Sequence, residues 1–263
     1  MNETRQEMLE IALEVARRAG DETLKHFQTD LLVETKEDAS PVTVADRAAE
    51  NIARRIIGER CPHDGIIGEE FGVTNPTAPR RWILDPIDGT LSFVQGVPLY
   101  GVLVAVEEED EAIVGVIHFP ALGDSVYAAA GEGCWWNGAA ARVSPVSRVE
   151  DAVVVCTHAE EIERRGHTAG WDALRHRARM VRTWGDCYGH ALVATGRAEA
   201  MIDPILARWD AAALKPVVEE AGGVYTDWSG AATQLSDSGI STNQLLAAEV
   251  RQILGAVPGD STA

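Results

Sequence analysis

Apolar residues recur at helical spacing over the first sixty residues of the chain. They lie three or four positions apart between residues 3 and 28, and again after Thr43 as far as about Arg60. Such spacing gives a helix one apolar face that packs against a core. We therefore predict two N-terminal helices, residues 3–28 and 44–60, with a short strand at residues 31–36 between them.

The middle of the chain has a strand pattern. β-branched and apolar residues form short runs that turn residues separate, at residues 81–84, 101–107, 112–118 and 125–130. Runs of this length with such boundaries predict strands. Asn137-Gly138 is a dipeptide typical of two-residue hairpin turns, so it predicts a hairpin at this point.

From about residue 150 the pattern alternates between strand and helix. We predict strands at residues 153–156, 180–183 and 200–202, and helices at residues 161–178, 209–221 and 243–254. Gly222 and Gly255 suit helix ends, and Pro216 should kink its helix. Residues 256–263 are expected to fray. The change of pattern predicts an α+β subdomain at residues 1–145 and an α/β subdomain at 146–263, forming one structural unit.

Composition narrows the classes of function. The chain has 263 residues, of which 46% are hydrophobic, and its net charge of -18 argues against a nucleic-acid or anionic-membrane partner. An anionic substrate remains compatible, because bound divalent cations reverse a local field. The four cysteines form no C-x-x-C pair, and we find neither a secretory signal nor a bilayer-spanning run. We therefore expect a cytoplasmic protein.

The densest chemical signal is the segment Asp85-Pro86-Ile87-Asp88-Gly89-Thr90, which follows an apolar strand. A turn at a strand end can aim both carboxylates at one point, and clusters of oxygen ligands suit Mg²⁺ or Mn²⁺. A short helix that begins at Gly89-Thr90 would offer free amides to a phosphate. The alternative is an acidic surface turn that binds nothing.

Four other acidic residues, in three segments, each have a simple structural explanation. Glu69 and Glu70 follow Gly68 in what could be an exposed turn, and Asp46 could be a charge in the first turn of a helix. Asp210 stands where the N-cap residue of the helix at 209–221 is expected. Taken singly, none of them predicts catalysis.

Taken together, these segments resemble the inositol monophosphatase superfamily. The similarity spans Asp38 to Gly223 and includes Gly-Glu-Glu, Asp-Pro-Ile-Asp-Gly-Thr and Trp-Asp-x-Ala-Ala in order. It implies a layered αβαβα sandwich of the inositol monophosphatase and fructose-1,6-bisphosphatase type. It also implies metal ligands at Glu69, Asp85, the Ile87 carbonyl, Asp88 and Asp210, with a third-metal shell of Asp46 and Glu70. Catalytic roles fall to Glu69, Asp88 and Thr90, and phosphate binding to the amides of Gly89 and Thr90.

Residues 182–190 are similar to the histidinol-phosphate phosphatase branch, which carries a related Gly-Asp-Cys-Tyr-Gly stretch. A carboxylate at Asp186 suits a cationic substrate, and Asp203 matches the family position that contacts the leaving alcohol. Asp186 could instead cap a helix that starts at Cys187. Leu91 departs from this branch, which commonly has Lys there. Trp135 and Trp136 could line the substrate pocket or only pack a hairpin.

The resemblance implies a magnesium-dependent hydrolase of a small phosphorylated metabolite, with two or three Mg²⁺ ions and Mn²⁺ as a substitute. Histidinol phosphate is the first substrate hypothesis. The others are inositol-1-phosphate or a wider set of sugar and nucleotide 3′-phosphates, and a non-catalytic regulator that binds metal or phosphate. Lithium inhibition and a homodimer are expected from the resemblance alone.

Overall fold

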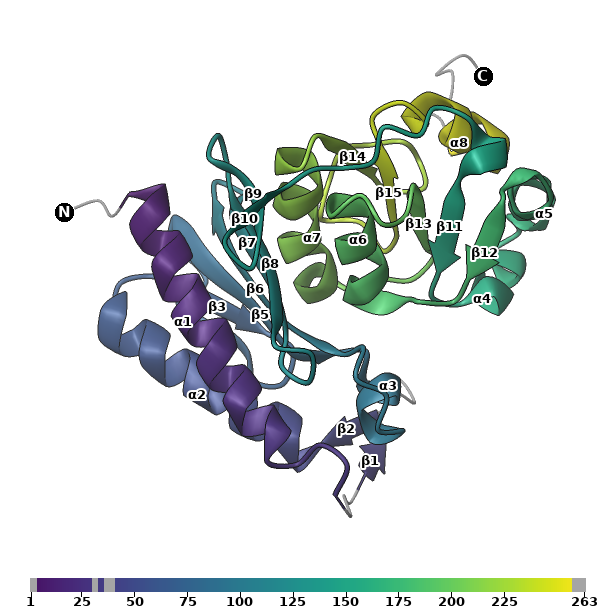
Figure 1. Cartoon of the computed structure of the whole chain (residues 1–263). Helices are drawn as coiled ribbons and strands as arrows, with labels where there is room; N and C mark the ends of the chain where they lie inside the picture. Colours follow the sequence, from purple (N-terminus) through teal and green to yellow (C-terminus); the bar gives the residue numbers. More distant parts are fainter. Residues whose placement is uncertain (1–3, 30–32, 36–40, 257–263) are drawn as a thin grey trace.

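The computed structural model describes residues 4–29, 33–35 and 41–256, and shows two β-sheets separated and covered by helices (Figure 1). Two helices cover one face of the first sheet, two more fill the space between the sheets, and three cover the second sheet. This is the αβαβα layering expected from the sequence, and the expectation is confirmed.

The first sheet has the strand order β10-β9-β8-β7-β6-β5-β3-β4 and is antiparallel except for the pair β3 and β5. Its strands are β3 (Gly65–Gly68), β4 (Gly72–Thr74), β5 (Arg80–Asp88), β6 (Gly101–Glu108), β7 (Glu111–Phe119), β8 (Asp124–Ala129), β9 (Gly133–Trp136) and β10 (Ala139–Ala141). The turn between β9 and β10 consists of Asn137 and Gly138, both at positive φ, as the dipeptide predicts.

Helices α1 (Arg5–Leu24) and α2 (Val44–Arg60) pack on the outer face of this sheet. Both begin with a capping box, in which Thr4 pairs with Glu7 and Thr43 pairs with Asp46. Their apolar stripes form one core with the sheet, so the two helices predicted from spacing are confirmed. A small pair of strands, β1 (Val33–Thr35) and β2 (Pro41–Thr43), leads into α2.

The second sheet has the order β12-β11-β13-β15-β14. Its strands are β11 (Val153–Cys156), β12 (Met180–Arg182), β13 (Ala200–Asp203), β14 (Gly223–Thr226) and β15 (Gly239–Asn243). Helices α6 (Asp186–Ala194) and α7 (Arg208–Glu220) lie between the two sheets, and α7 continues through Pro216. The outer layer holds α4 (Ala159–Arg164), α5 (Thr168–Arg177) and α8 (Ala247–Leu254), with the 3-10 turn η1 (Val149–Asp151) beside them.

Several elements differ from the sequence predictions. The single helix expected at residues 161–178 is two helices, because the chain turns at Gly166 with φ of 84°. The last helix starts at Ala247 rather than Asn243, which ends β15 and accepts a hydrogen bond from the Leu246 amide. Strands β3, β4, β14 and β15 were not predicted. Most of the predicted tail, and part of the strand expected at 31–36, lies outside the described residues.

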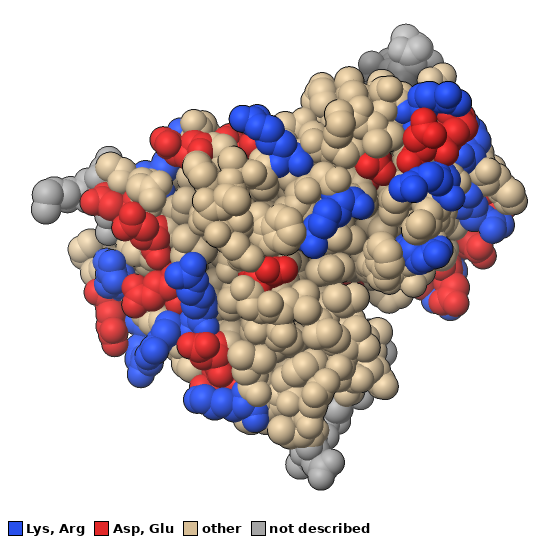
Figure 2. All heavy atoms as spheres, viewed as in Figure 1, with Lys and Arg blue, Asp and Glu red and all other residues tan. Residues whose placement is uncertain are grey.

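Figure 2 shows Lys and Arg side chains interspersed with Asp and Glu on this face of the molecule, over α1 and over the outer layer of the second sheet. No basic patch dominates the described surface on this face, in keeping with the net charge of -18. Among the described helices, none is long and apolar enough to cross a membrane.

Candidate active site

The end of β5 presents two carboxylates from one irregular strand. β5 pairs regularly with β6 up to Asp85 opposite Leu103, and an extra residue then shifts the register so that Asp88 lies opposite Gly101. A bulge of this kind re-aims side chains at a strand end. Asp85 accepts a hydrogen bond from the Ile87 amide at 2.9 Å, which holds its carboxylate against the turn. The short helix α3 (Thr90–Val94) follows at once, as predicted.

The third carboxylate comes from the start of α7. Asp210 is the third residue of the helix and accepts a hydrogen bond at 2.7 Å from the amide of Ala207, which is the N-cap. The expectation that Asp210 occupies the N-cap position is therefore wrong by three residues. Its carboxylate both completes the helix start and faces the other two acids.

A fourth element joins the two sheets at this point. The Cys187 amide, in the first turn of α6, donates a hydrogen bond of 2.6 Å to Asp88 Oδ2. The partial positive charge at a helix N-terminus favours an anion there. The site therefore lies between the halves of the chain and depends on their packing.

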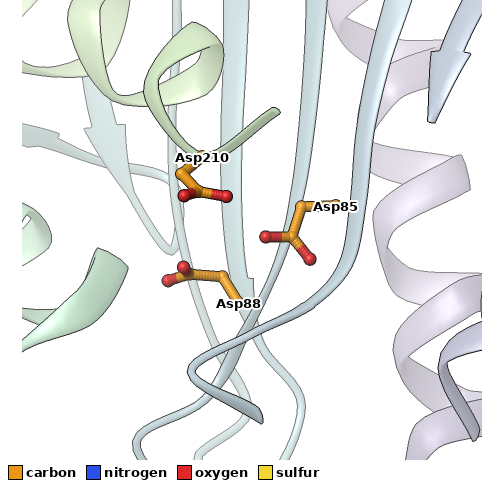
Figure 3. A group of neighbouring side chains, drawn as sticks. All are labelled: Asp85, Asp88 and Asp210. Carbon is orange, nitrogen blue, oxygen red and sulfur yellow. The ribbon is translucent and has the colours of Figure 1, made fainter. Parts of the chain in front are cut away.

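Asp85, Asp88 and Asp210 turn toward one another (Figure 3). One carboxylate oxygen of each lies within 4.8 Å of the others. Burial raises the pKa of Asp210 to about 7 and the pKa values of Asp85 and Asp88 well above their ordinary value. The charge of Asp210 adds to the effect on Asp85 and Asp88, and the charge of Glu69 adds to the effect on Asp210. Within the described ranges no Lys or Arg forms an ion pair with these three acids. Buried anions of this kind suit a divalent cation, so the donor set fits Mg²⁺ or Mn²⁺.

Glu69 lines the same pocket, although it lies outside the group of three. Its charge raises the pKa values of Asp85 and Asp210, so it lies near both. The turn that carries Glu69 is held by a residue that the sequence analysis missed. The fully buried Glu50 accepts hydrogen bonds from the amide of Glu70 at 2.7 Å and the amide of Phe71 at 3.2 Å, and from Arg54 Nε at 2.7 Å.

Asp46 has the helix-terminal position that the simple explanation predicts. Its Oδ2 accepts hydrogen bonds from the amide and the hydroxyl of Thr43. Burial raises its pKa to about 6, and the charges of Glu69 and Glu70 contribute. Asp46 therefore lies near Glu69 and Glu70, and the role of Asp46 and Glu70 around a third metal stays a prediction.

Thr90 and Ile87 contact each other directly. The Thr90 hydroxyl donates a hydrogen bond of 3.1 Å to the Ile87 carbonyl, which the family resemblance implies as a metal ligand. The hydroxyl is thus held at the rim of the acidic cluster, where the resemblance places the attacking water. Gly89 has φ of 80°, a left-handed conformation that glycine adopts readily.

The three acids form the floor of a pocket of about 550 Å³, a size that suits a small metabolite. Asp186 and Asp203 also line it, and their contact with substrate stays a prediction. Thr157, His158 and Trp209, which the sequence analysis missed, line it as well. Thr157 directly follows the buried strand β11, and a polar residue at that position is the signal that could have found it.

Asp186 does not act as a helix cap. The N-cap of α6 is Gly185, and the first amides of the helix, those of Asp186 and Cys187, donate to Thr157 and Asp88 instead. Asp186 is instead half-buried in the pocket lining, where desolvation and the charge of Asp203 raise its pKa to about 6. Trp135 and Trp136 are absent from the pocket lining, and Arg197 stacks on Trp136 at 4.3 Å, so the hairpin-packing explanation holds for both.

Comparisons with known proteins show which family the chain belongs to. The chain is 45% identical over 249 residues to the histidinol-phosphatase of Chlorobaculum parvum, covering 94% of this chain and 96% of that protein. It is 39% identical over 254 residues to the histidinol-phosphatase of Mycobacterium tuberculosis, covering 94% and 98%. The structure of the extragenic suppressor protein suhB from Bartonella henselae superposes with a TM-score of 0.89 at 27% identity, covering 94% and 98%. Residues 4–255 match the sequence model of the inositol monophosphatase family, and the chain belongs to that family.

Proposed function

We propose that this protein is a magnesium-dependent phosphatase that hydrolyses histidinol phosphate to histidinol and phosphate. The observation that carries the reaction class is the convergence of Asp85, Asp88 and Asp210 on the floor of the pocket. The substrate is supported by the histidinol-phosphatases of similar sequence and by the two further acids in the pocket wall. Histidinol phosphate carries an amine and an imidazole, and both form charge-assisted hydrogen bonds with carboxylates.

The residues that would hold two or three Mg²⁺ ions are Glu69, Asp85, the Ile87 carbonyl, Asp88 and Asp210, with Asp46 and Glu70 around the third. Bound divalent cations would lower the pKa of a water and neutralise charge on the phosphoryl oxygens. Burial raises the pKa values of Asp85, Asp88 and Asp210, so a bound cation would stabilise the ionised form of these three carboxyls.

The remaining steps fall to the chain itself. Glu69 and Thr90 would orient the attacking water, and Glu69 would accept its proton. The amides of Gly89 and Thr90, at the start of α3, would bind the phosphate oxygens. Asp186 and Asp203 would bind the cationic groups of the alcohol and align it for in-line displacement.

The direct test is phosphate release from histidinol phosphate, inositol-1-phosphate, fructose-1,6-bisphosphate and 3′-phosphoadenosine 5′-phosphate, with magnesium and with EDTA. We expect magnesium-dependent release with the highest kcat/KM for histidinol phosphate. Release from no ester in the presence of magnesium would contradict the reaction class and favour a regulator that binds metal or phosphate. A preference for inositol-1-phosphate would contradict only the substrate.

One observation favours a broader specificity as a second candidate. Leu91 lies at the pocket with 57% of its surface exposed, at the position where the histidinol-phosphate branch commonly has Lys. An apolar side chain at this position discriminates less between substrates of different charge than Lys would. The enzyme would then hydrolyse several phosphate esters. We propose assembly into a homodimer from the family resemblance alone, and a cytoplasmic location from the cysteine pattern and the absence of a recognisable secretory signal in the sequence.

The raised pKa values predict a link between pH, magnesium and stability. A carboxyl whose pKa is higher in the folded than in the unfolded state stabilises the fold at low pH, and the effect is lost as pH rises through the folded pKa, which is about 7 for Asp210. Without metal, the melting temperature should therefore fall from pH 5 to pH 8. Saturating magnesium should raise it by about 5–10 °C at pH 8 and by less at pH 6.

Differential scanning fluorimetry in EDTA and in magnesium chloride, with sodium chloride at matched ionic strength, measures both effects. An equal gain from magnesium at both pH values would show that the buried carboxyls do not bind the ion in their ionised form.

A further inference from the structure

Thr157 occupies the point where two acidic residues of the pocket wall meet. It follows β11, and its hydroxyl donates a hydrogen bond of 2.7 Å to Oδ2 of Asp203. The Thr157 hydroxyl oxygen in turn accepts a hydrogen bond of 2.9 Å from the main-chain amide of Asp186. One hydroxyl group thus links the carboxylate of one acid to the backbone of the other, using both its donor and an acceptor position.

Each of the two acids depends on this contact. Asp186 has φ of 52°, a left-handed conformation that is unfavourable for a residue with a side chain, and the hydrogen bond to Thr157 fixes its amide. Asp203 is 1% exposed, and the Thr157 hydroxyl is its shortest hydrogen bond, since the Ile205 amide donates at 3.4 Å. Behind Asp203, the ring of the fully buried His190 lies 3.9 Å from the same Oδ2 and donates no hydrogen bond to it.

We infer that Thr157 is a specificity-determining positioning residue. It fixes the spacing of Asp186 and Asp203 so that together they bind a cationic group on the alcohol part of the substrate. The inference rests on the proposed function and deepens it. Removing the hydroxyl leaves Oδ2 of Asp203 without its best donor and frees the Asp186 amide. The Asp203 carboxylate and the Asp186 backbone then shift from the geometry in which the two acids share one cationic ligand. The phosphate end of the pocket, on β5 and α3, makes neither hydrogen bond and stays in place.

The test compares Thr157→Val, which keeps the branched shape and removes the hydroxyl, with Thr157→Ser, which keeps the hydroxyl. We expect Thr157→Val to raise KM for histidinol phosphate about tenfold, the effect of one charge-assisted hydrogen bond, with kcat within about twofold. KM for p-nitrophenyl phosphate, whose alcohol carries no cation, should change by less than about twofold. Thr157→Ser should restore the wild-type values.

Thr195→Val is a matched control in the same half of the chain. The Thr195 hydroxyl also donates to an oxygen, the Ala191 carbonyl, and accepts from a nitrogen, Arg197 Nε, but it lies outside the pocket. This variant should leave the KM values of both substrates unchanged. If Thr157→Val changes both substrates alike, or if Thr157→Ser fails to restore KM, then Thr157 has only a structural role and the inference is wrong.

Calorimetric binding of histidinol and of histidinol phosphate separates this inference from the proposed reaction. A wild-type protein that hydrolyses neither ester but binds histidinol, more weakly after Thr157→Val, would contradict the reaction and support the inference. A wild-type protein that hydrolyses p-nitrophenyl phosphate but binds no histidinol would overturn the inference and leave the phosphatase reaction standing. A double-mutant cycle with Asp203→Asn should show a smaller effect of Thr157→Val in the Asn background, because the two residues act together.

Discussion

Replacing Asp88 by asparagine should lower magnesium-dependent phosphate release by a factor on the order of a thousand, the size of effect seen when a group that stabilises transition-state charge is removed. A carboxylate oxygen of Asp88 lies within 4.8 Å of one from Asp85 and one from Asp210, so the three could bind one cation. A neutral amide in place of Asp88 cannot supply the negative charge that a divalent cation needs. Turnover of histidinol phosphate and p-nitrophenyl phosphate should fall alike, since the loss concerns the phosphoryl end of the pocket.

The same change should not damage the fold. An asparagine can still accept the hydrogen bond that the Cys187 amide donates to Asp88. The substitution also removes a buried carboxyl that the neighbouring charges of Asp186 and Asp210 repel when it is ionised. We therefore expect the metal-free variant to melt at the wild-type temperature or above it, while the gain in melting temperature from magnesium largely disappears. Stability and activity would then change in opposite directions at one residue.

Asp64→Asn is the matched control for this experiment. Asp64 is another largely buried aspartate, but it accepts hydrogen bonds from Arg80 Nε at 2.7 Å and Trp82 Nε1 at 2.8 Å and lies outside the acidic cluster. Its substitution should lower the melting temperature and leave the magnesium dependence of turnover intact. Wild-type turnover by Asp88→Asn, measured as phosphate release, would refute the assignment of Asp88 to metal binding.

The sequence predicted the parts of this site that lie in single segments. Asp85, Asp88 and Gly89 lie at the end of one apolar strand, and the segment indicated a turn that could aim two carboxylates at one point, with an acidic surface turn as the alternative. The αβαβα fold followed from the family resemblance, and the amphipathic spacing of α1 and α2 gave their positions within a few residues. The division of the chain at residue 145 stays a prediction.

Contacts between distant segments could not be predicted in this way. The hydrogen bond between Asp88 and the Cys187 amide joins residues 99 positions apart, and the two hydrogen bonds of Thr157 join segments 29 and 46 positions apart. No local pattern marks Glu50 as the hydrogen-bond acceptor for the turn after β3. From the sequence, a glutamate on α2 is expected to lie on the solvent-exposed face of the helix. Strands β3 and β4 escaped prediction because each is four residues or fewer and bordered by glycine, so neither shows a clear period.

Replacing Gly89 by alanine should lower kcat/KM for histidinol phosphate about a hundredfold while the protein stays folded. Two effects combine at this residue. Its φ of 80° disfavours any side chain, and a Cβ there would lie 2.9 Å from Oδ2 of Asp186. The added methyl group therefore displaces the Asp186 carboxylate and shifts the amides that would bind phosphate. Misplacement of reacting groups by about an ångström costs roughly a hundredfold in rate.

Gly123→Ala separates the two effects. Gly123 has φ of 67°, and a Cβ there would meet no atom within 4 Å, so this control tests backbone strain alone. It should lower the melting temperature slightly and leave kcat/KM unchanged. Adding Asp186→Ala to Gly89→Ala removes the carboxylate that the methyl group displaces, so turnover of p-nitrophenyl phosphate should recover in part and selectivity for histidinol phosphate should not. If Gly89→Ala keeps wild-type kcat/KM for both esters, the close approach of Asp186 to the phosphate-binding turn plays no part in catalysis.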